Sequence, residues 1–423
     1  MLKRSRVLYA STIDALSGRL GLDVDYLVRG GFYGGLQQIV GLTSGLVIAY
    51  VFGHYASIYL FGEYNLLLSI VSLFSLLSIP GLNTALLRSV GEGFDSSLST
   101  ALWTRLKWSF LAVPFFLIAS LYYQFRGSDV LPSLLILAAI FFPFLFSLQV
   151  FQPFFTAKKR FDLGALFSSV SSVLTATLVS LAVLLTSDLT FILGGYFLGL
   201  ILPALVGYFK AVTMAKSIKV DSEFLRYGYF LTGIQLLPTA VGYLSNIMLA
   251  TMLGVDVLAV YTVATKFPLL VQKNFDVFYQ PISAKLANAS DQDYSRIMTK
   301  HIVKLVLLGL AMFASLWLLA PTLIQLFYGR QYVEAIGLAR WYALMILPLP
   351  LLWVFNDVIT FQKQRGVKLI LSTILPIGTL VAYWIAIPKW QIAGLIAIML
   401  AERYVTLLTM GAAVWLKPRH ETT

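Results

Sequence analysis

Two lysines stand in a stretch, residues 257–281, that is otherwise apolar enough to cross a membrane. Lys266 and Lys273 are seven residues apart, which places both on one helical face, about 10 Å from each other along the axis. Gln280 continues this stripe. A charged side chain at the bilayer centre costs about 2.5–3.5 kcal/mol on insertion scales, so we expect it to face a cavity, a partner or a pathway. A basic face on a buried helix suits an anionic ligand such as a phosphate.

Two structural alternatives compete with ligand binding at this stripe. The long stem of Lys273 lets its ammonium reach partly toward the cytoplasmic interface, about two turns away. Asp276, three residues further along the helix, is also placed to neutralise Lys273. Asp276 is at the same time a candidate for coupling transport to an ion, because acidic residues inside membranes often carry protons or cations.

Residues 391–416 carry Glu402 and Arg403 near the middle of another apolar stretch. Adjacent residues of a helix point about 100° apart, so each of the two needs its own partner or water. Glu402 is a candidate for ion coupling, or else it neutralises a lysine of another helix. Arg403 either lines a cavity and contacts substrate or closes a salt bridge between helices.

Three further polar residues are candidates for substrate binding. Arg88 lies at the predicted cytoplasmic end of the second apolar stretch, where it either contacts substrate or only sets orientation. Gln37 and Gln38 lie in the first apolar stretch, which is uncharged. Gly34 and Gly35 precede them, and small residues at such positions favour close helix packing.

Membrane-spanning helices must position these side chains, because the bilayer has no water to satisfy an unpaired backbone. A spanning helix needs about 20 mostly apolar residues. Twelve stretches meet this requirement: residues 31–52, 64–87, 103–124, 130–152, 163–186, 189–212, 227–251, 257–281, 302–326, 338–361, 367–388 and 391–416. Proline interrupts several of them, Pro80 among them. We therefore predict an all-α integral membrane protein with about twelve transmembrane helices in two six-helix bundles that enclose a central cavity.

The basic residues predict the orientation, because cytoplasmic loops carry an excess of Lys and Arg. With the N-terminus inside, the inside segments hold most of them: Lys3, Arg4, Arg6, Arg19, Arg29, Arg88, Arg105, Lys107, Lys158, Lys159, Arg160, Lys210, Lys216, Lys219, Arg226, Lys285, Arg296, Lys300, Lys304, Lys363, Arg365, Lys368, Lys417 and Arg419. The outside connections hold only Arg126, Arg330 and Lys389, with Arg340 at the start of a span. We expect an even number of spans and two cytoplasmic termini.

Composition excludes several classes of function. Hydrophobic residues make up 59% of the chain and charged residues 12%, about half the share of a soluble protein. The net charge of +12 is explained by cytoplasmic loops, so no nucleic-acid partner is expected. The chain has no cysteine and three scattered histidines, which argues against a disulfide, a thiolate or a metal site. No glycine-rich phosphate loop or catalytic triad is present, and we expect neither a cofactor nor an enzyme.

The predicted organisation has three parts. Residues 1–29 are basic and mixed in polarity, which is typical of a cytoplasmic amphipathic lead-in lying on the membrane surface. Residues 30–219 and 220–423 then form the two six-helix bundles. Some positions recur at a constant offset between them, such as Tyr64 with Tyr261. These matches indicate a parallel repeat, with chance matching among apolar helices as the alternative.

Several segments resemble one family of membrane proteins. Ile48–His54, Phe61–Asn65 and Pro80–Val90 resemble the first two helices of polysaccharide-export flippases, with their Tyr-Gly loop and Gly-Leu…Arg ending. Asn246–Asp256 with Ala259–Ala264 resembles the matching pair in the second half. Phe151-Gln152 followed by Lys158–Phe161 is similar to the end of the family's fourth helix. The likeness covers nearly the whole chain in span number and layout, although each motif alone is loose.

These flippases belong to the multidrug, oligosaccharidyl-lipid and polysaccharide exporter superfamily. The resemblance implies a V-shaped cavity that opens alternately to each side of the bacterial cytoplasmic membrane. It implies an undecaprenyl-diphosphate-linked oligosaccharide as the substrate, flipped outward for O-antigen, lipopolysaccharide or another surface polysaccharide. Arg88, Lys266 and Lys273 then correspond to likely diphosphate contacts. The resemblance also implies that the protein acts as a monomer in the lipid bilayer, with the polysaccharide polymerase machinery as a partner. Asn246 stands where many relatives have an acid, which puts cation coupling there in doubt.

Other functions compete with this assignment. A cation-coupled multidrug exporter of the same superfamily favours an acidic cavity, which the lysine stripe argues against. A lipid II flippase usually has two additional helices. A membrane glycan polymerase or ligase generally displays a large outer loop, and here the outer connections are short. A scaffold without transport gives no reason for buried lysines.

Overall fold

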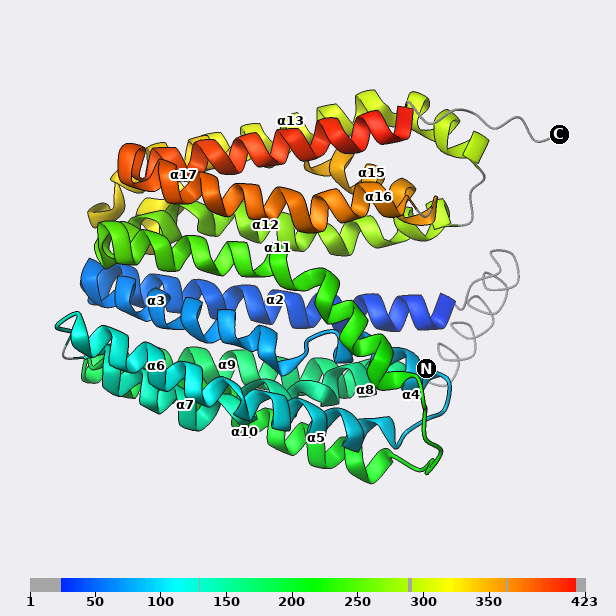
Figure 1. Cartoon of the computed structure of the whole chain (residues 1–423), viewed down its shortest axis with the longest axis horizontal. Coiled ribbons are helices and arrows are strands. Elements are labelled where there is room, and N and C mark those ends of the chain that lie inside the picture. Colours follow the sequence, from blue (N-terminus) through cyan, green and yellow to red (C-terminus); the bar gives the residue numbers. More distant parts are fainter. Residues whose placement is uncertain (1–23, 129, 288–290, 363, 416–423) are drawn as a thin grey trace, which may run out of the picture. The chain divides into compact units, whose positions relative to one another are not determined.

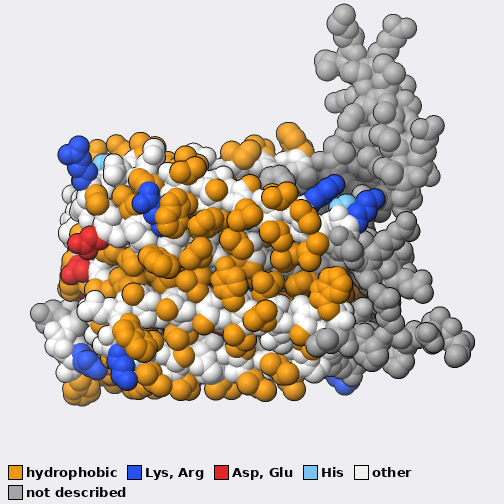
Figure 2. Space-filling view, turned by 90° about the horizontal axis from the view of Figure 1, so that it is seen from above, with side chains coloured by type: hydrophobic (Ala, Val, Ile, Leu, Met, Phe, Trp, Pro, Cys, Tyr) orange, Lys and Arg blue, Asp and Glu red, His pale blue; other side chains and the backbone are white. Residues whose placement is uncertain are grey.

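The computed structural model describes residues 24–128, 130–287, 291–362 and 364–415, and within these residues it is helical without any strand (Figure 1). Residues 1–23 of the predicted lead-in lie outside this part. On the face shown in Figure 2, apolar side chains cover the middle and the Lys and Arg side chains lie mainly toward the two ends. Such a distribution suits a helix bundle whose sides face lipid tails.

Ten helical segments of the described chain are long and apolar enough to cross a membrane. They are Gly30–Tyr55, Ile58–Ser78, Ser97–Phe125, Leu131–Ala157, Phe161–Leu185, Leu189–Met214, Phe224–Leu253, Val255–Phe275, Lys300–Tyr328 and Gly366–Trp415. Leu349–Phe361 is a shorter apolar helix at the position of the tenth predicted span. The segment Gly366–Trp415 has 50 residues, more than twice the about 20 that a bilayer needs, and is two spans in one. The predicted all-α architecture of about twelve spans is therefore confirmed.

A tight turn separates the last two spans. α16 (Arg365–Leu369) and a π-helical turn, η4 (Ile370–Ile374), lead into α17 (Leu375–Trp415). Gln391 interrupts α17 with φ 51° and ψ −139°, so the chain folds back there. A Cβ on Gly394 would stand 2.7 Å from the Ala386 carbonyl oxygen, which shows how closely the two limbs approach. In Figure 1 these limbs lie side by side in orange and red.

The second span is broken where Pro80 predicted an interruption. α3 (Ile58–Phe74) continues as η1 (Ser75–Ser78), and the helix restarts as α4 (Leu82–Gly91). Between them Ile79 adopts a left-handed conformation with φ 53°. Because proline cannot donate a backbone hydrogen bond, the ladder stops here and a new helix begins. α4 carries Arg88, so the break sets the direction of the segment that presents this residue.

The described residues form two compact units. Unit 1 contains residues up to Val51 and Phe74–Thr232, and unit 2 contains Phe52–Leu73 and Gly233–Thr423. The boundaries fall inside α2 (Val24–Tyr55) and α11 (Phe224–Leu253), so these helices contribute to both units. The predicted division into residues 30–219 and 220–423 follows the sequence repeat, and it stays a prediction.

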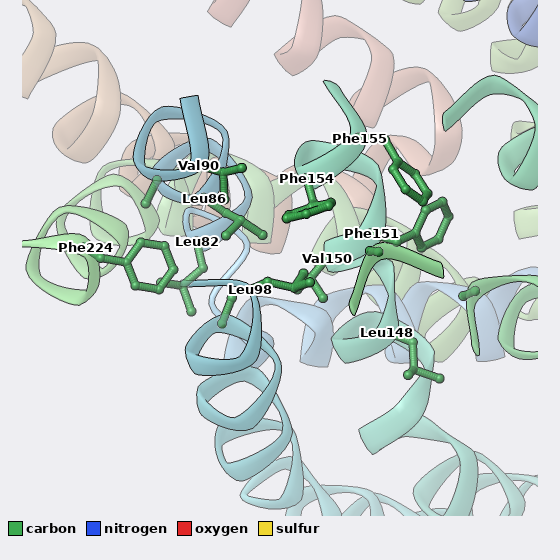
Figure 3. Close-up of a cluster of buried hydrophobic side chains, with 14 of the residues drawn as sticks. Leu82, Leu86, Val90, Leu98, Leu148, Val150, Phe151, Phe154, Phe155 and Phe224 are labelled. Carbon is green, nitrogen blue, oxygen red and sulfur yellow. The ribbon is translucent and has the colours of Figure 1, made fainter. Parts of the chain in front are cut away.

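Unit 1 has a core of aliphatic and aromatic side chains. Besides α4 it contains α5 (Ser97–Phe110), α6 (Ala112–Phe125), α7 (Leu131–Ser147), η2 (Leu148–Val150), α8 (Phe151–Ala157), α9 (Phe161–Leu185) and α10 (Leu189–Met214). Leu82, Leu86 and Val90 line one face of α4 and pack with Phe154 of α8 (Figure 3). This packing holds α4 and leaves Arg88 on its exposed side.

Unit 2 contains the long helices of the second half. They are α12 (Val255–Ala287), α13 (Asp291–Tyr328), η3 (Arg330–Tyr332), α14 (Glu334–Ala343), α15 (Leu349–Phe361), α16, η4 and α17. A second core joins Tyr279 of α12 to Val358 of α15 and Met410 of α17. The candidate residues on α12 and α17 therefore stand on helices that one core connects.

Candidate functional site

Lys266 is a cation without a partner in the described part of unit 2. It lies half-buried on α12 between Thr265 and Phe267, both of which are buried. The described residues place no carboxylate within ion-pair distance of its ammonium. The Thr265 hydroxyl donates to the Tyr261 carbonyl at 3.0 Å, so it serves the helix backbone instead. The charge that acts on Lys266 is the like charge of Lys273.

Lys273 lies on the same helix as predicted, and its side chain is exposed. The structure thus brings the two predicted lysines within electrostatic range of each other. The side chains of Asp276 and Gln280 lie outside the described residues, so neutralisation of Lys273 by Asp276 stays a hypothesis. Two cations on one helical face repel each other, and an anion bound between them offsets that repulsion.

Arg403 is only partly satisfied by the protein. Its Nε donates to the Met345 carbonyl at a long 3.4 Å, and its buried Nη2 has no hydrogen-bond partner among the described atoms. Tyr404 donates its hydroxyl to the Leu344 carbonyl at 3.2 Å. Both carbonyls follow the last residue of α14, where a helix leaves backbone oxygens unpaired and favours cations. The interhelical salt bridge that the sequence allowed for Arg403 is absent among these residues.

Glu402 lies beside a group of buried tyrosines that sequence reasoning missed. Tyr342 of α14 and Tyr383 of α17 both lie within electrostatic range of Glu402. Tyr261 of α12 packs edge-on against Tyr342, with ring centroids 6.5 Å apart, and donates its hydroxyl to the Met399 sulfur at 3.3 Å. The available signal was the occurrence of tyrosine inside apolar spans, because a buried phenol needs a polar partner.

The predicted candidates in unit 1 differ from those in unit 2. Arg88 is exposed, donates to Glu92 at 2.9 Å and lies over the Tyr227 ring at 5.3 Å. Gln37 and Gln38 are half-buried on α2, and Gln38 makes an interaction with another residue. Arg88 is thus held by neighbours, whereas Lys266 is not.

The packing role expected of the first glycines is wrong. A Cβ built on Gly34 or Gly35 meets no atom within 4 Å, so these positions do not bring helices close together. Gly41 lies 3.8 Å from the Ser172 hydroxyl, an ordinary contact. Asn246 donates to the Ser69 hydroxyl at 3.0 Å, and its amide thereby joins α11 to α3.

Arg105 has a structural role that the sequence did not reveal. Its cytoplasmic side stays a prediction, and the structure buries it inside α5 at 2% exposure. Its Nε donates to the Ser78 carbonyl at 3.1 Å, and its terminal nitrogens donate to the Ser78 hydroxyl and the Asn83 amide oxygen. These partners lie on both sides of the break at Pro80, so Arg105 connects η1 to α4. It supports the segment that carries Arg88.

A buried carboxylate holds three connecting segments of unit 1 together. Asp95 is 2% exposed and accepts backbone hydrogen bonds from Lys216 at 2.9 Å and Ser217 at 3.2 Å. Its Oδ1 lies 2.6 Å from the Lys158 ammonium and has no other partner among the described residues. Burial opposes ionisation, but Lys158 and the two N–H groups outweigh it and lower the pKa of Asp95. The segment that follows α10 is therefore attached to unit 1.

The structure places the candidate residues in two sets. Lys266, Lys273, Glu402 and Arg403 belong to unit 2, whereas Arg88, Gln37 and Gln38 belong to unit 1. Convergence of the two sets on one cavity stays a prediction. What the arrangement provides within unit 2 is positive charge that the described protein atoms leave uncompensated.

Solved structures share this fold at low sequence identity. An inward-facing multidrug resistance MATE family transporter of the MOP superfamily aligns with a TM-score of 0.67 and 15% identity, covering 91% of this chain and 100% of that one. The lipid II flippase MurJ in an inward closed conformation aligns with a TM-score of 0.64 and 14% identity, covering 92% and 87%. A MOP superfamily transporter from Pyrococcus furiosus with a binding pocket of reverse polarity gives 0.59 and 15%, covering 92% and 95%.

Sequence comparison identifies the family directly. None of the curated proteins matches the chain. A family model described as polysaccharide biosynthesis protein matches residues 27–287, which is more than half of the chain. This segment includes the broken second span and the lysine stripe of α12. The chain therefore belongs to the polysaccharide biosynthesis protein family and is a multi-pass membrane protein.

Proposed function

We propose that this protein is a flippase for a lipid-linked oligosaccharide. It moves an undecaprenyl-diphosphate-linked repeat unit from the inner to the outer leaflet of the bacterial cytoplasmic membrane, for O-antigen or another surface polysaccharide. The polysaccharide biosynthesis family and the fold shared with the MurJ lipid II flippase support this assignment. The observation that carries it is Lys266, a half-buried cation inside a membrane span with no carboxylate among its described neighbours.

The charge of the cargo explains why such a cation is useful. A diphosphate carries at least two negative charges, and moving them through hydrocarbon without counter-charges is prohibitively costly. Lys266 and Lys273 offer two positive charges about 10 Å apart along α12, and Arg403 has a buried nitrogen free of hydrogen bonds among the described atoms. The polyprenyl chain needs no such help, because it is as apolar as the surrounding lipid.

Alternating access is the mechanism we assign to this activity. Lys266, Lys273 and Arg403 contact the diphosphate, Arg88 receives it at the inner surface, and Gln37 and Gln38 bind sugar hydroxyls. Return to the inward-facing state is coupled to an ion gradient, with Glu402 and Asp276 as candidate coupling groups. In this proposal the protein acts as a monomer with both termini in the cytoplasm, next to the polysaccharide polymerase.

The test replaces each lysine of the stripe singly by Ala and by Arg in a strain that lacks the chromosomal copy. Losing one charge-assisted contact of about 1.5–3 kcal/mol lowers export of surface glycan about 10- to 100-fold for Lys266→Ala, while Lys266→Arg keeps part of it. Lys210→Ala is the matched control, because Lys210 is an exposed lysine on another spanning helix, α10. Membrane levels of each variant are measured by immunoblot.

Two outcomes contradict the proposal in different ways. If the Lys266→Ala Lys273→Ala double variant exports a normal amount of surface glycan, the proposed role of these lysines in binding the diphosphate is contradicted. A deletion strain whose lipid-linked repeat units do not accumulate on the cytoplasmic leaflet removes the flippase assignment itself. Resistance to cationic drugs that depends on the gene, with normal surface glycan, favours the multidrug exporter instead; the MATE fold of a structural neighbour makes this the alternative worth measuring.

A further inference from the structure

Backbones approach each other closely at several places in unit 2. We name one of them the outer seam because the predicted topology puts it on the outer side. It joins Gly53 and Gly62, near the turn between α2 and α3, to Val255 at the start of α12 and Tyr328 at the end of α13. A Cβ on Gly62 would stand 2.1 Å from the Val255 carbonyl oxygen, and one on Gly53 would stand 2.3 Å from the Tyr328 Cα. Only glycine fits at both positions.

Side chains complete the outer seam. The Gln331 amide donates to the Gly53 carbonyl at 2.7 Å and so links η3 to the end of α2. Phe61 packs against Tyr328 and Tyr332, with ring centroids 5.9 Å and 6.2 Å apart. The seam therefore joins the first helical hairpin of the chain to helices that lie two hundred residues away in sequence.

A carboxyl group lies directly behind the outer seam. Glu63 follows Gly62 and is 3% exposed, whereas Asp256 follows Val255 and is exposed. The Tyr59 hydroxyl donates to the Glu63 carboxylate, and Asp256 acts on it as a like charge. Neither carboxylate forms an ion pair with a described Lys, Arg or His.

Other titratable or charged groups stand on the elements packed at the outer seam, among them the exposed Arg330 of η3. Tyr332 of η3 lies within range of Asp256, and Tyr328 of α13 packs on Phe61. His54 at the end of α2 lies beside Gly329, so a His54→Gln variant serves as a control. Burial next to a like charge, without an ion-pair partner among the described residues, favours the protonated form of a carboxyl group.

We propose that Glu63 is a proton-binding site that controls the outer seam. When α3 lies against α12, Glu63 is buried and holds a proton. When Glu63 is ionised, its repulsion from Asp256 and its need for water separate the two helices. Asp256, which is exposed at the edge of the outer seam, receives the proton from the outer side. The role of this step in a transport cycle rests on the proposed function: cargo leaves outward, a proton binds, and the seam closes for the return.

The absence of cysteine from the chain allows a direct test. Val255→Cys places a single thiol where a Cβ on Gly62 would lie only 3.0 Å from the Val255 Cβ, so the closed seam covers this half-buried position in part. The purified full-length protein in detergent is labelled with a membrane-impermeant maleimide between about pH 5 and about pH 8. Lys389→Cys, an exposed thiol, supplies the reference that corrects for thiol ionisation.

The expected result is a corrected labelling rate that rises with pH, by up to about tenfold per pH unit while Glu63 is mostly protonated. Glu63→Gln, which resembles the protonated form, keeps labelling slow at every pH. Asp256→Asn moves the midpoint to lower pH because a like charge is removed. Tyr59→Phe moves it to higher pH, because the ionised carboxylate loses a donor, and so tests the site even if Glu63→Gln does not accumulate.

Three results overturn the proposal. They are a corrected rate that does not change with pH, a pH dependence that survives in Glu63→Gln, and a transition that disappears in His54→Gln. Closure by sodium at constant pH also overturns it, because the site then binds a metal cation and not a proton. The labelling assay measures access to the outer seam and does not involve the transported substrate. A negative result therefore contradicts the role of Glu63 without contradicting the flippase assignment.

Discussion

Arg105 in unit 1 and Lys266 in unit 2 are both cations inside spanning helices, and neither has a carboxylate partner among the described residues. They differ in what the protein offers them. Arg105 is 2% exposed, and its guanidinium group donates to a carbonyl, a hydroxyl and an amide oxygen around the break of the second span. Lys266 is half-buried and has no described hydrogen-bond partner.

This difference separates structural from functional charge. A planar guanidinium satisfied by neutral oxygens fixes local geometry, since all of those oxygens lose their donor if it is removed. A flexible ammonium that the described protein atoms leave unsatisfied is available to water or to a ligand. A charge inside the membrane therefore does not by itself identify a substrate site. What distinguishes a structural cation from a functional one is whether the protein provides hydrogen-bond acceptors for it.

The largest effect that this comparison predicts is on folding. Arg105→Met leaves the Ser78 carbonyl and the Asn83 amide without their buried donor, so we expect a loss of about 3–5 kcal/mol of stability and little protein in the membrane. Arg105→Lys keeps the charge but not the planar set of guanidinium donors, so we expect it to recover only part of the lost stability. The measurement is thermal unfolding in detergent together with membrane abundance. Lys107→Ala, an exposed neighbour on α5, is the control; an equal loss there contradicts the structural role of Arg105.

Lys266 is expected to behave in the opposite way. Lys266→Met removes a cation that has no partner among the described residues and leaves none of their acceptors unsatisfied. We therefore expect the Tm to stay unchanged or rise while glycan export falls. Measuring both quantities on the same preparation sharpens the comparison. A lowered Tm at normal export reverses the roles assigned to the two residues.

The sequence predicted the spans well because hydropathy and basic loops are local signals. Pro80 correctly marked a break, since proline removes a backbone donor wherever it stands. The roles of Arg105 and Lys266 were not predictable in the same way. The acceptors of Arg105 lie 22 and 27 residues away and reach it only through packing of η1 and α4 on α5. The tyrosines around Glu402 come from three helices, so no spacing in the chain reveals them.

Asp95 supplies a third case, a buried charge that does have an ionic partner, and its expected effect is intermediate. Asp95→Asn weakens the ion pair with Lys158 and should cost about 1–3 kcal/mol near neutral pH. Because folding lowers the pKa of Asp95, its contribution is fully present above the ordinary value of 3.8 and is lost as the pH falls through the folded-state value. Unfolding curves of wild type and Asp95→Asn should therefore differ at neutral pH and converge in acid. Curves that stay parallel contradict this ionic role.

The smallest effect is expected at Arg88, an exposed cation whose ionic partner, Glu92, is also exposed. Its contact with Glu92 links two exposed side chains, and such pairs add little to stability. Arg88→Ala should therefore leave the Tm unchanged, and it should lower glycan export less than Lys266→Ala does. Raising the salt concentration screens an exposed charge far more than a buried one, so in a reconstituted flipping assay the deficit of Arg88→Ala should shrink with salt while that of Lys266→Ala persists. Equal salt dependence of the two variants would place Arg88 in the same environment as Lys266 and remove the distinction between a surface contact and an interior one.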